Sequence, residues 1–206
     1  MKISQQQSNR WKRLIVLVIP IFLIGAVKVL SIWKEIPVGN LTWDIVATAN
    51  VPVYTGFFSQ IGIFFWVATA TLCIFSASLS SQHQEILGFK RFLYVSGFLT
   101  IFLGVDDIFL LHEAVFPFFG IPEKVVYASY GFILISWIVK FYTTILRTDY
   151  ILLLMAFFFL GLSVGLDVFP LSNIDLYLFE DGFKMTGIVS WFFYFYGNSV
   201  KAVSKT

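Results

Sequence analysis

Long apolar runs, separated by short polar stretches, dominate the chain. Six of these runs approach the roughly 20 residues that an α-helix needs to cross a hydrocarbon core about 30 Å thick. The run at 57–79 carries no charged residue and gives the clearest signal. The six runs cover residues 14–33, 57–79, 92–112, 125–145, 150–169 and 182–199. The pattern therefore predicts an all-α integral membrane protein, a bundle of about six transmembrane helices forming one domain over residues 1–206.

The composition agrees with a membrane protein and argues against other classes. Of the 206 residues, 58% are hydrophobic and only 13% are charged, which is about half the charged fraction of a soluble domain. The net charge is +2 and the lysines and arginines are dispersed, so we expect no nucleic-acid partner. Cys73 is the single cysteine, which excludes a disulfide within the chain. The lipid bilayer is the expected partner.

Basic residues gather at one end of the predicted spans. Cytoplasmic loops of membrane proteins are enriched in Lys and Arg. With the amino terminus inside, ten basic residues fall on the inner side and three on the outer side, while Lys28 lies within the first run. The inner ones are Lys2, Arg10, Lys12, Arg13, Lys90, Arg91, Lys140, Arg147, Lys201 and Lys205, and the outer ones are Lys34, Lys124 and Lys184. This bias predicts a plasma or inner membrane protein with both termini in the cytoplasm.

Acidic residues show the opposite distribution. Ten of the twelve lie in the outer half of the spans or beyond it, although the rule for basic residues makes little demand on Asp and Glu. Asp106 and Asp107 lie within the third run, about 20 Å from its inner end at 1.5 Å per residue. A charge at that depth costs at least about 2.5 kcal/mol unless it is paired, protonated or hydrated. The two carboxylates therefore indicate a functional site.

The third run ends in the sequence Val-Asp-Asp-Ile-Phe-Leu-Leu-His-Glu, residues 105–113. On one continuous helix Asp106 and Glu113 would share a face about 10 Å apart, with Asp107 and His112 on either side. That separation is too long for one ion, so a metal site would need carboxylates from other spans. The candidate catalytic residues are Asp106, Asp107, His112 and Glu113, and the candidate metal ligands are Asp106, Asp107, Asp167, Glu180 and Asp181.

Lys184 is the basic residue expected nearest to these acids, and we predict that it is their charge partner, within reach of Asp107 or Asp167. A site of carboxylates with at most one histidine suits Mg²⁺, Ca²⁺ or Mn²⁺ better than zinc. Structural roles remain open as well. Glu180 and Asp181 suit the amino terminus of a helix, Asp167 suits a hydrogen-bonded helix end, and His112 suits the membrane interface.

Two glycines in the fifth run, Gly161 and Gly165, form a small-xxx-small face. Such a face lets another helix approach closely, and here we expect packing within the bundle rather than dimerisation. The sequence does not predict the oligomeric state.

Three classes of function are compatible with these features. The favoured one is an enzyme or binding protein whose site opens outward and uses a divalent cation to act on a lipid headgroup or small solute. A cation-coupled or proton-coupled transporter is an alternative, but the inner halves of the spans offer only scattered hydroxyls for a second access path. The third is a structural or assembly subunit whose acids bind a basic partner surface.

Overall fold

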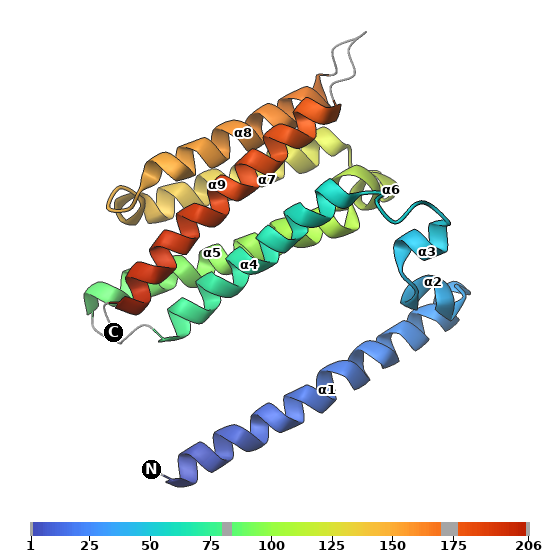
Figure 1. The fold of residues 1–206 in the computed structure, drawn as a ribbon, viewed down its shortest axis with the longest axis horizontal. Helices are drawn as coiled ribbons and strands as arrows, with labels where there is room; N and C mark the ends of the chain where they lie inside the picture. The colour runs from blue at the N-terminus through green and yellow to red at the C-terminus, as the bar shows by residue number, and fades with distance from the viewer. Residues whose placement is uncertain (1, 80–83, 170–176, 205–206) are drawn as a thin grey trace. The chain divides into compact units, whose positions relative to one another are not determined.

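The computed structural model describes residues 2–79, 84–169 and 177–204, and these residues form helices and no strand. The chain divides into two compact units, Met1–Thr55 and Gly56–Thr206, and each unit is described by itself (Figure 1). The expectation of one domain over residues 1–206 stays a prediction.

The first unit consists of one long helix followed by two short ones. Glu35, with a positive φ of 55°, ends the long helix just before Pro37, which cannot continue it. Asp44 caps the last helix, because its Oδ1 accepts hydrogen bonds from the main-chain nitrogens of Val46 and Ala47. The helices are α1 (Lys2–Lys34), α2 (Val38–Thr42) and α3 (Ile45–Ala49).

The second unit holds the remaining helices. Two antiparallel pairs, α4 with α5 and α8 with α9, run side by side (Figure 1). Helix α9 also packs along α4 in the same direction, because Trp66 contacts Trp191 near one end and Ser76 contacts Ser199 near the other. The elements are α4 (Phe57–Leu79), α5 (Gln84–Phe109), the π-helical turn η1 (Leu111–Val115), α6 (Phe116–Phe118), α7 (Glu123–Ile145), α8 (Tyr150–Val168) and α9 (Tyr177–Ser204).

Five segments among the described residues are long and apolar enough to cross a membrane, which is consistent with a membrane protein. They correspond to the first five predicted runs. The sixth predicted run lies within α9, which is not among the five. Helix α9 contains the polar residues Ser190, Asn198 and Ser199, which lower its average hydropathy. These residues are buried against protein inside the bundle, so they do not face lipid. The five segments are Val16–Lys34, Phe57–Leu79, Gly88–Phe109, Glu123–Ile145 and Tyr150–Val168.

The expected third helix, 92–112, has the wrong carboxyl end. Helix α5 ends at Phe109, and Leu110 adopts the left-handed conformation with φ 50° and ψ 47°. This conformation costs a residue with a side chain about 1–2 kcal/mol, and it redirects the chain into η1. Asp106 and His112 therefore do not lie on one continuous helix, and the angles derived from that assumption are wrong.

An aromatic cluster fills the interior of the bundle. Phe92, Trp137, Trp191, Tyr194 and Phe195 are each at most 4% exposed. Their ring centroids lie 4.8–6.5 Å apart, in the stacked, tilted and edge-to-face arrangements that aromatic pairs prefer. We call these five residues the aromatic core. It joins α5, α7 and α9.

Hydroxyl groups satisfy the polar edges of this core. The indole nitrogen of Trp137 donates to Ser96 Oγ at 3.1 Å, and that of Trp191 donates to Thr100 Oγ1 at 3.0 Å. Without these acceptors, each buried N–H would cost about 1–3 kcal/mol. Two hydroxyls in the first half of the third run, Ser96 and Thr100, thus hold α5 to α7 and α9.

Glycine permits close helix packing at a position other than the expected one. A Cβ at Gly187 of α9 would lie 2.6 Å from Leu160 Cγ and 2.9 Å from the Leu160 main-chain nitrogen of α8. At Gly161 and Gly165 a Cβ would meet nothing within 4 Å. The prediction that these two glycines form a close helix contact is therefore wrong.

Candidate functional site

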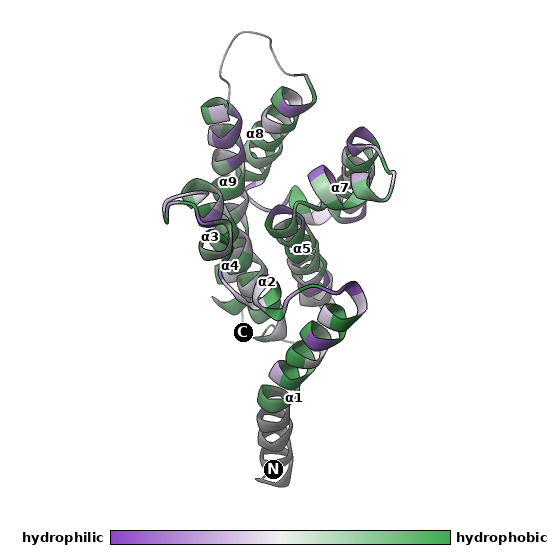
Figure 2. Ribbon diagram, turned by 90° about the vertical axis from the view of Figure 1, so that its right-hand side faces the viewer, coloured by the Kyte–Doolittle hydropathy of each residue, from purple (hydrophilic) through white to green (hydrophobic). Residues whose placement is uncertain are grey.

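A cavity of about 310 Å³, here called the polar pocket, lies where α5 and α8 end and α7 and α9 begin. Trp66 of α4 forms part of one wall, and Trp191 of the aromatic core also lines the cavity. In Figure 2, hydrophilic colour marks the last turn of α8 and the first turns of α9, whereas the middle of both helices is mostly hydrophobic. The ionisable side chains of Asp106, Asp107, His112, Glu113, Asp167, Glu180 and Lys184, together with Tyr127 and Tyr130, line this pocket.

The buried pair of Asp106 and His112 is held by two contacts. His112 Nδ1 lies 2.6 Å from Asp106 Oδ2, and the main-chain nitrogen of His112 donates to Asp106 Oδ1 at 3.0 Å. The left-handed turn at Leu110 makes both contacts possible, because it folds η1 back toward the end of α5. Each of the two residues is 7% exposed. Asp106 therefore fixes both the position and the ring orientation of His112.

The other ring nitrogen of His112 faces Glu113, with Nε2 3.2 Å from Oε1. The side chain of Glu113 is 48% exposed, so it connects the buried pair to the pocket mouth. Burial lowers the pKa of His112, but the hydrogen bond and charge of Asp106, together with the charge of Glu113, outweigh burial and raise this pKa above its ordinary value. The imidazolium form is favoured because one ring nitrogen bonds to Asp106 and the negative charge of Glu113 lies beside the other.

Lys184 of α9 forms an ion pair with Asp107 of α5, the contact expected from the sequence. Lys184 Nζ contacts Asp107 Oδ1, and the Asp107 side chain is only 6% exposed. The second oxygen, Oδ2, is buried and has no hydrogen-bond partner among the described residues. Removal of Lys184 would leave the buried carboxylate of Asp107 without its charge partner, which would destabilise the fold.

Two tyrosines of α7, which the sequence reasoning missed, complete the polar pocket. Tyr130 donates to Asp106 Oδ1 at 2.8 Å, and Tyr127 donates to Asp167 Oδ2 at 2.6 Å. The ring of Tyr127 also lies 5.1 Å from that of His112. The available signal was their spacing of three residues, which puts both phenols on one helix face near the amino-terminal end of the fourth run.

The predicted metal ligands lie near the pocket but are engaged separately. Asp106 pairs with His112, Asp107 with Lys184, and Asp167 with Tyr127. Asp181 is exposed and is not among the pocket-lining residues. Within residues 2–79, 84–169 and 177–204, no group of three or more His, Cys, Asp or Glu side chains is arranged to hold a metal ion. The divalent-cation site stays a prediction.

The contacts form a series that begins at the exposed side chain of Glu113, passes through the buried pair and ends at the partly buried Tyr130. It runs from Glu113 through His112 and Asp106 to the hydroxyl of Tyr130, with separations of 3.2, 2.6 and 2.8 Å. Each member can give or accept a proton, and the aspartate holds the histidine in position. The arrangement can donate a proton to a bound polar group or bind that group through charge.

The chain belongs to the family described as Domain of unknown function (DUF8692), whose model matches residues 14–197. The match includes every residue that lines the polar pocket. Comparison with curated proteins and comparison with solved structures each give no match.

Proposed function

We propose that this member of the DUF8692 family is a six-span membrane protein that binds a lipid headgroup or a small polar solute in the polar pocket. In this proposal α9 is the sixth span, both termini are cytoplasmic, and the pocket opens toward the outer face. The excess of basic residues at the opposite end of the spans supports this orientation.

The observation that carries the proposal is that buried charged groups line a cavity. Asp106, Asp107 and His112 are each 7% exposed, yet all three line the space of about 310 Å³. An ion pair whose role is only to join helices would be more stable in a closely packed interior, because an adjacent cavity removes dispersion contacts. A cavity of this volume with apolar walls and a few convergent polar groups is typical of a ligand site.

His112 supplies the acid–base chemistry in this proposal. Asp106 holds the Nδ1 side of the ring, so the Nε2 side is free to exchange its contact with Glu113 for one with a bound group. Proton donation from Nε2 would serve either simple recognition of an anion or a reaction at the bound headgroup. The proposal therefore includes an enzyme as well as a binding protein.

The two alternatives have less support. A transporter needs polar groups on both sides of its site, but the aromatic core occupies the bundle interior below the pocket. A structural subunit that binds a basic partner would expose its acids, whereas Asp106 and Asp107 are buried and already paired.

The proposal is tested by thermal melting of the purified protein with choline, ethanolamine, glycerol 3-phosphate and inorganic phosphate. A ligand that binds only the folded state raises the melting temperature in a saturable way. We expect at least one probe to do so in the wild type and in the Asp181→Asn control. The Asp107→Asn and His112→Gln variants should lose the response. No saturable shift with any probe, or equal shifts in all variants, would overturn the proposal.

A further inference from the structure

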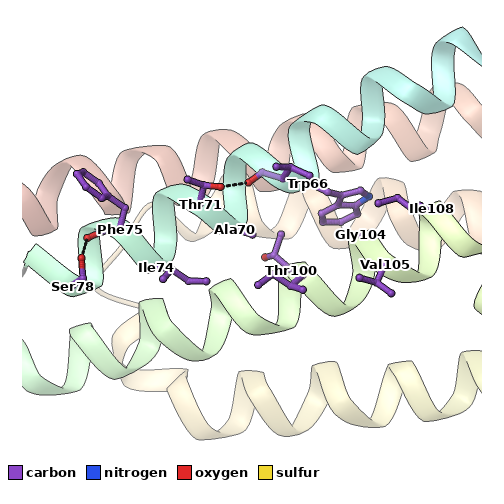
Figure 3. Close-up of a pocket in the computed structure, with 12 residues that line it drawn as sticks. Trp66, Ala70, Thr71, Ile74, Phe75, Ser78, Thr100, Gly104, Val105 and Ile108 are labelled. Atoms are coloured by element: carbon purple, nitrogen blue, oxygen red, sulfur yellow. Dashed lines mark hydrogen bonds between the residues drawn. The ribbon is translucent and has the colours of Figure 1, made fainter. Parts of the chain in front are cut away.

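A second cavity, of about 500 Å³, lies between α4 and α5 and is here called the apolar groove (Figure 3). Its walls are the residues from Trp66 to Ser78 on one face of α4 and from Thr100 to Ile108 on one face of α5. The small residues Ala70 and Gly104 form its floor, where a Cβ at Gly104 would lie 3.1 Å from Trp66 Cβ, and Ile74, Phe75 and Val105 make the walls apolar. The groove follows the long axis of the two helices.

Trp66 lines both the apolar groove and the polar pocket. Figure 3 shows its indole at one end of the groove, near Gly104 and Ile108. Trp66 is 4% exposed, and its indole N–H is buried without an acceptor among the described residues. A buried donor without an acceptor costs about 1–3 kcal/mol, so a ligand oxygen at this position would relieve that cost.

The length and direction of the groove fit one hydrocarbon chain. Trp66 and Ser78 are twelve residues apart, which corresponds to about 18 Å along a helix. One leaflet contributes about half of a hydrocarbon core of about 30 Å. In the proposed orientation the groove begins beside the pocket and runs toward the inner side, as the chain of an outer-leaflet lipid does.

The charge of the polar pocket favours a cationic head. Five carboxylates line it, against one lysine and one histidine. The unpartnered Oδ2 of Asp107 lies 3.9 Å from the Cβ position of Gly62, which is one helical turn before Trp66 on the same side of α4. The unsatisfied acceptor therefore faces a residue of α4 that is one turn before the residue carrying the unsatisfied donor, and aromatic walls add attraction for an ammonium group.

We propose that the polar pocket and the apolar groove together bind a membrane amphiphile with an amine head and one long chain. The ammonium group contacts Asp107 Oδ2, a hydroxyl or carbonyl oxygen next to the head accepts from Trp66 Nε1, and the chain lies between α4 and α5. This inference rests on the proposed function and names its ligand class. An amine suits the site better than a metal ion because the carboxylates are separately paired.

The test uses phosphatidylcholine nanodiscs containing the full chain and three probes brominated near the head: hexadecylamine, hexadecanol and hexadecanoic acid. The chain has six tryptophans, so the fluorescence quenching that belongs to Trp66 is obtained as the difference between the wild type and Trp66→Phe. Val67→Phe fills the groove, and Val139→Phe adds the same ring on an exposed face of α7. We expect the amine to bind at least about tenfold more tightly than the alcohol, and Val67→Phe alone to weaken it about tenfold, the loss expected when about two methylene groups are no longer buried.

Two results would overturn the inference. One is equal quenching by the three probes in the wild type, a comparison that does not depend on the folding of any variant. The other is an unchanged affinity in Val67→Phe. If small headgroup probes still shift the melting temperature in that case, the proposed function of the polar pocket stands and only the amphiphile proposal is contradicted. If neither small probes nor amphiphiles bind, both proposals fail.

Discussion

His112 Nδ1 lies 2.6 Å from Asp106 Oδ2 although six residues separate them, and the main-chain nitrogen of His112 donates to the other oxygen of the same carboxylate. The left-handed residue Leu110 lies between them, so the ends of α5 and η1 are joined by a local ionic contact. Because Asp106 is one of the buried acids of α5, this contact links the turn to the bundle interior.

Removal of either member should reveal the coupling between Asp106 and His112. We expect Asp106→Asn and His112→Gln each to lower the free energy of unfolding, with a coupling of about 0.5–3 kcal/mol in a double-mutant cycle. The measurement is unfolding of the purified protein in mixed micelles. Additive effects of the two substitutions would show that the contact contributes no coupling free energy.

The stability should also depend on pH through His112. Its folded pKa is raised above the unfolded value, so its contribution is fully present below the unfolded pKa and is lost as the pH rises through the folded pKa. The melting temperature should therefore decrease over that interval in the wild type. His112→Gln should remove this part of the pH dependence, and an unchanged profile in the variant would contradict the assignment.

Two glycines on facing helices give a matched test of the packing. Gly187→Ala should destabilise the bundle by about 1–3 kcal/mol, because the added Cβ would approach Leu160 of α8 to 2.6 Å. Gly161→Ala should cause no comparable loss, because a Cβ there meets nothing within 4 Å. Equal melting temperatures for the two variants would show that α8 and α9 do not pack as described.

The divalent-cation hypothesis has its own test. If Asp106 and Asp107 bind an ion, Mg²⁺, Ca²⁺ or Mn²⁺ should raise the melting temperature at neutral pH, and the rise should disappear as the carboxylates protonate. The double variant Asp106→Asn, Asp107→Asn should remove the metal content and the response. A double variant that keeps the full response would contradict the hypothesis.

The apolar runs were sufficient to predict most helices, because hydrophobic length is a property of consecutive residues. The run at 57–79 matches α4 at both ends, and the run at 150–169 matches α8 to within one residue. Helix α9 differs because it extends five residues beyond each end of the predicted run at 182–199. Its polar Ser190 and Asn198 donate to main-chain oxygens of α9 itself, and Ser199 bonds to Ser76 of α4, so these residues lie inside the bundle although they lower the mean hydropathy of the helix.

The candidate site was predictable in its charges but not in its geometry. The contact between Asp107 and Lys184 was predictable because an unpaired carboxylate at that depth is costly and Lys184 is the basic residue nearest to it in the sequence pattern. The turn at Leu110 was missed because leucine is not a residue that favours the left-handed conformation. Tyr130 was missed because a phenol at the end of a span also suits the membrane interface.

The proposed function requires a negatively charged pocket that lies within the bundle and opens on the side opposite the termini. Gly161 lines this pocket and has space for a side chain, while Cys73 is fully buried. The measurement is the labelling rate of Gly161→Cys in a Cys73→Ala background, in oriented vesicles, with cationic and anionic methanethiosulfonates.

We expect labelling from the face opposite the termini, at least about tenfold faster for the cationic reagent at low salt, since nearby carboxylates raise the local concentration of cations. Val139→Cys on the exposed face of α7 should label slowly with both reagents. Equal rates for the two reagents, or labelling only from the side of the termini, would contradict the account.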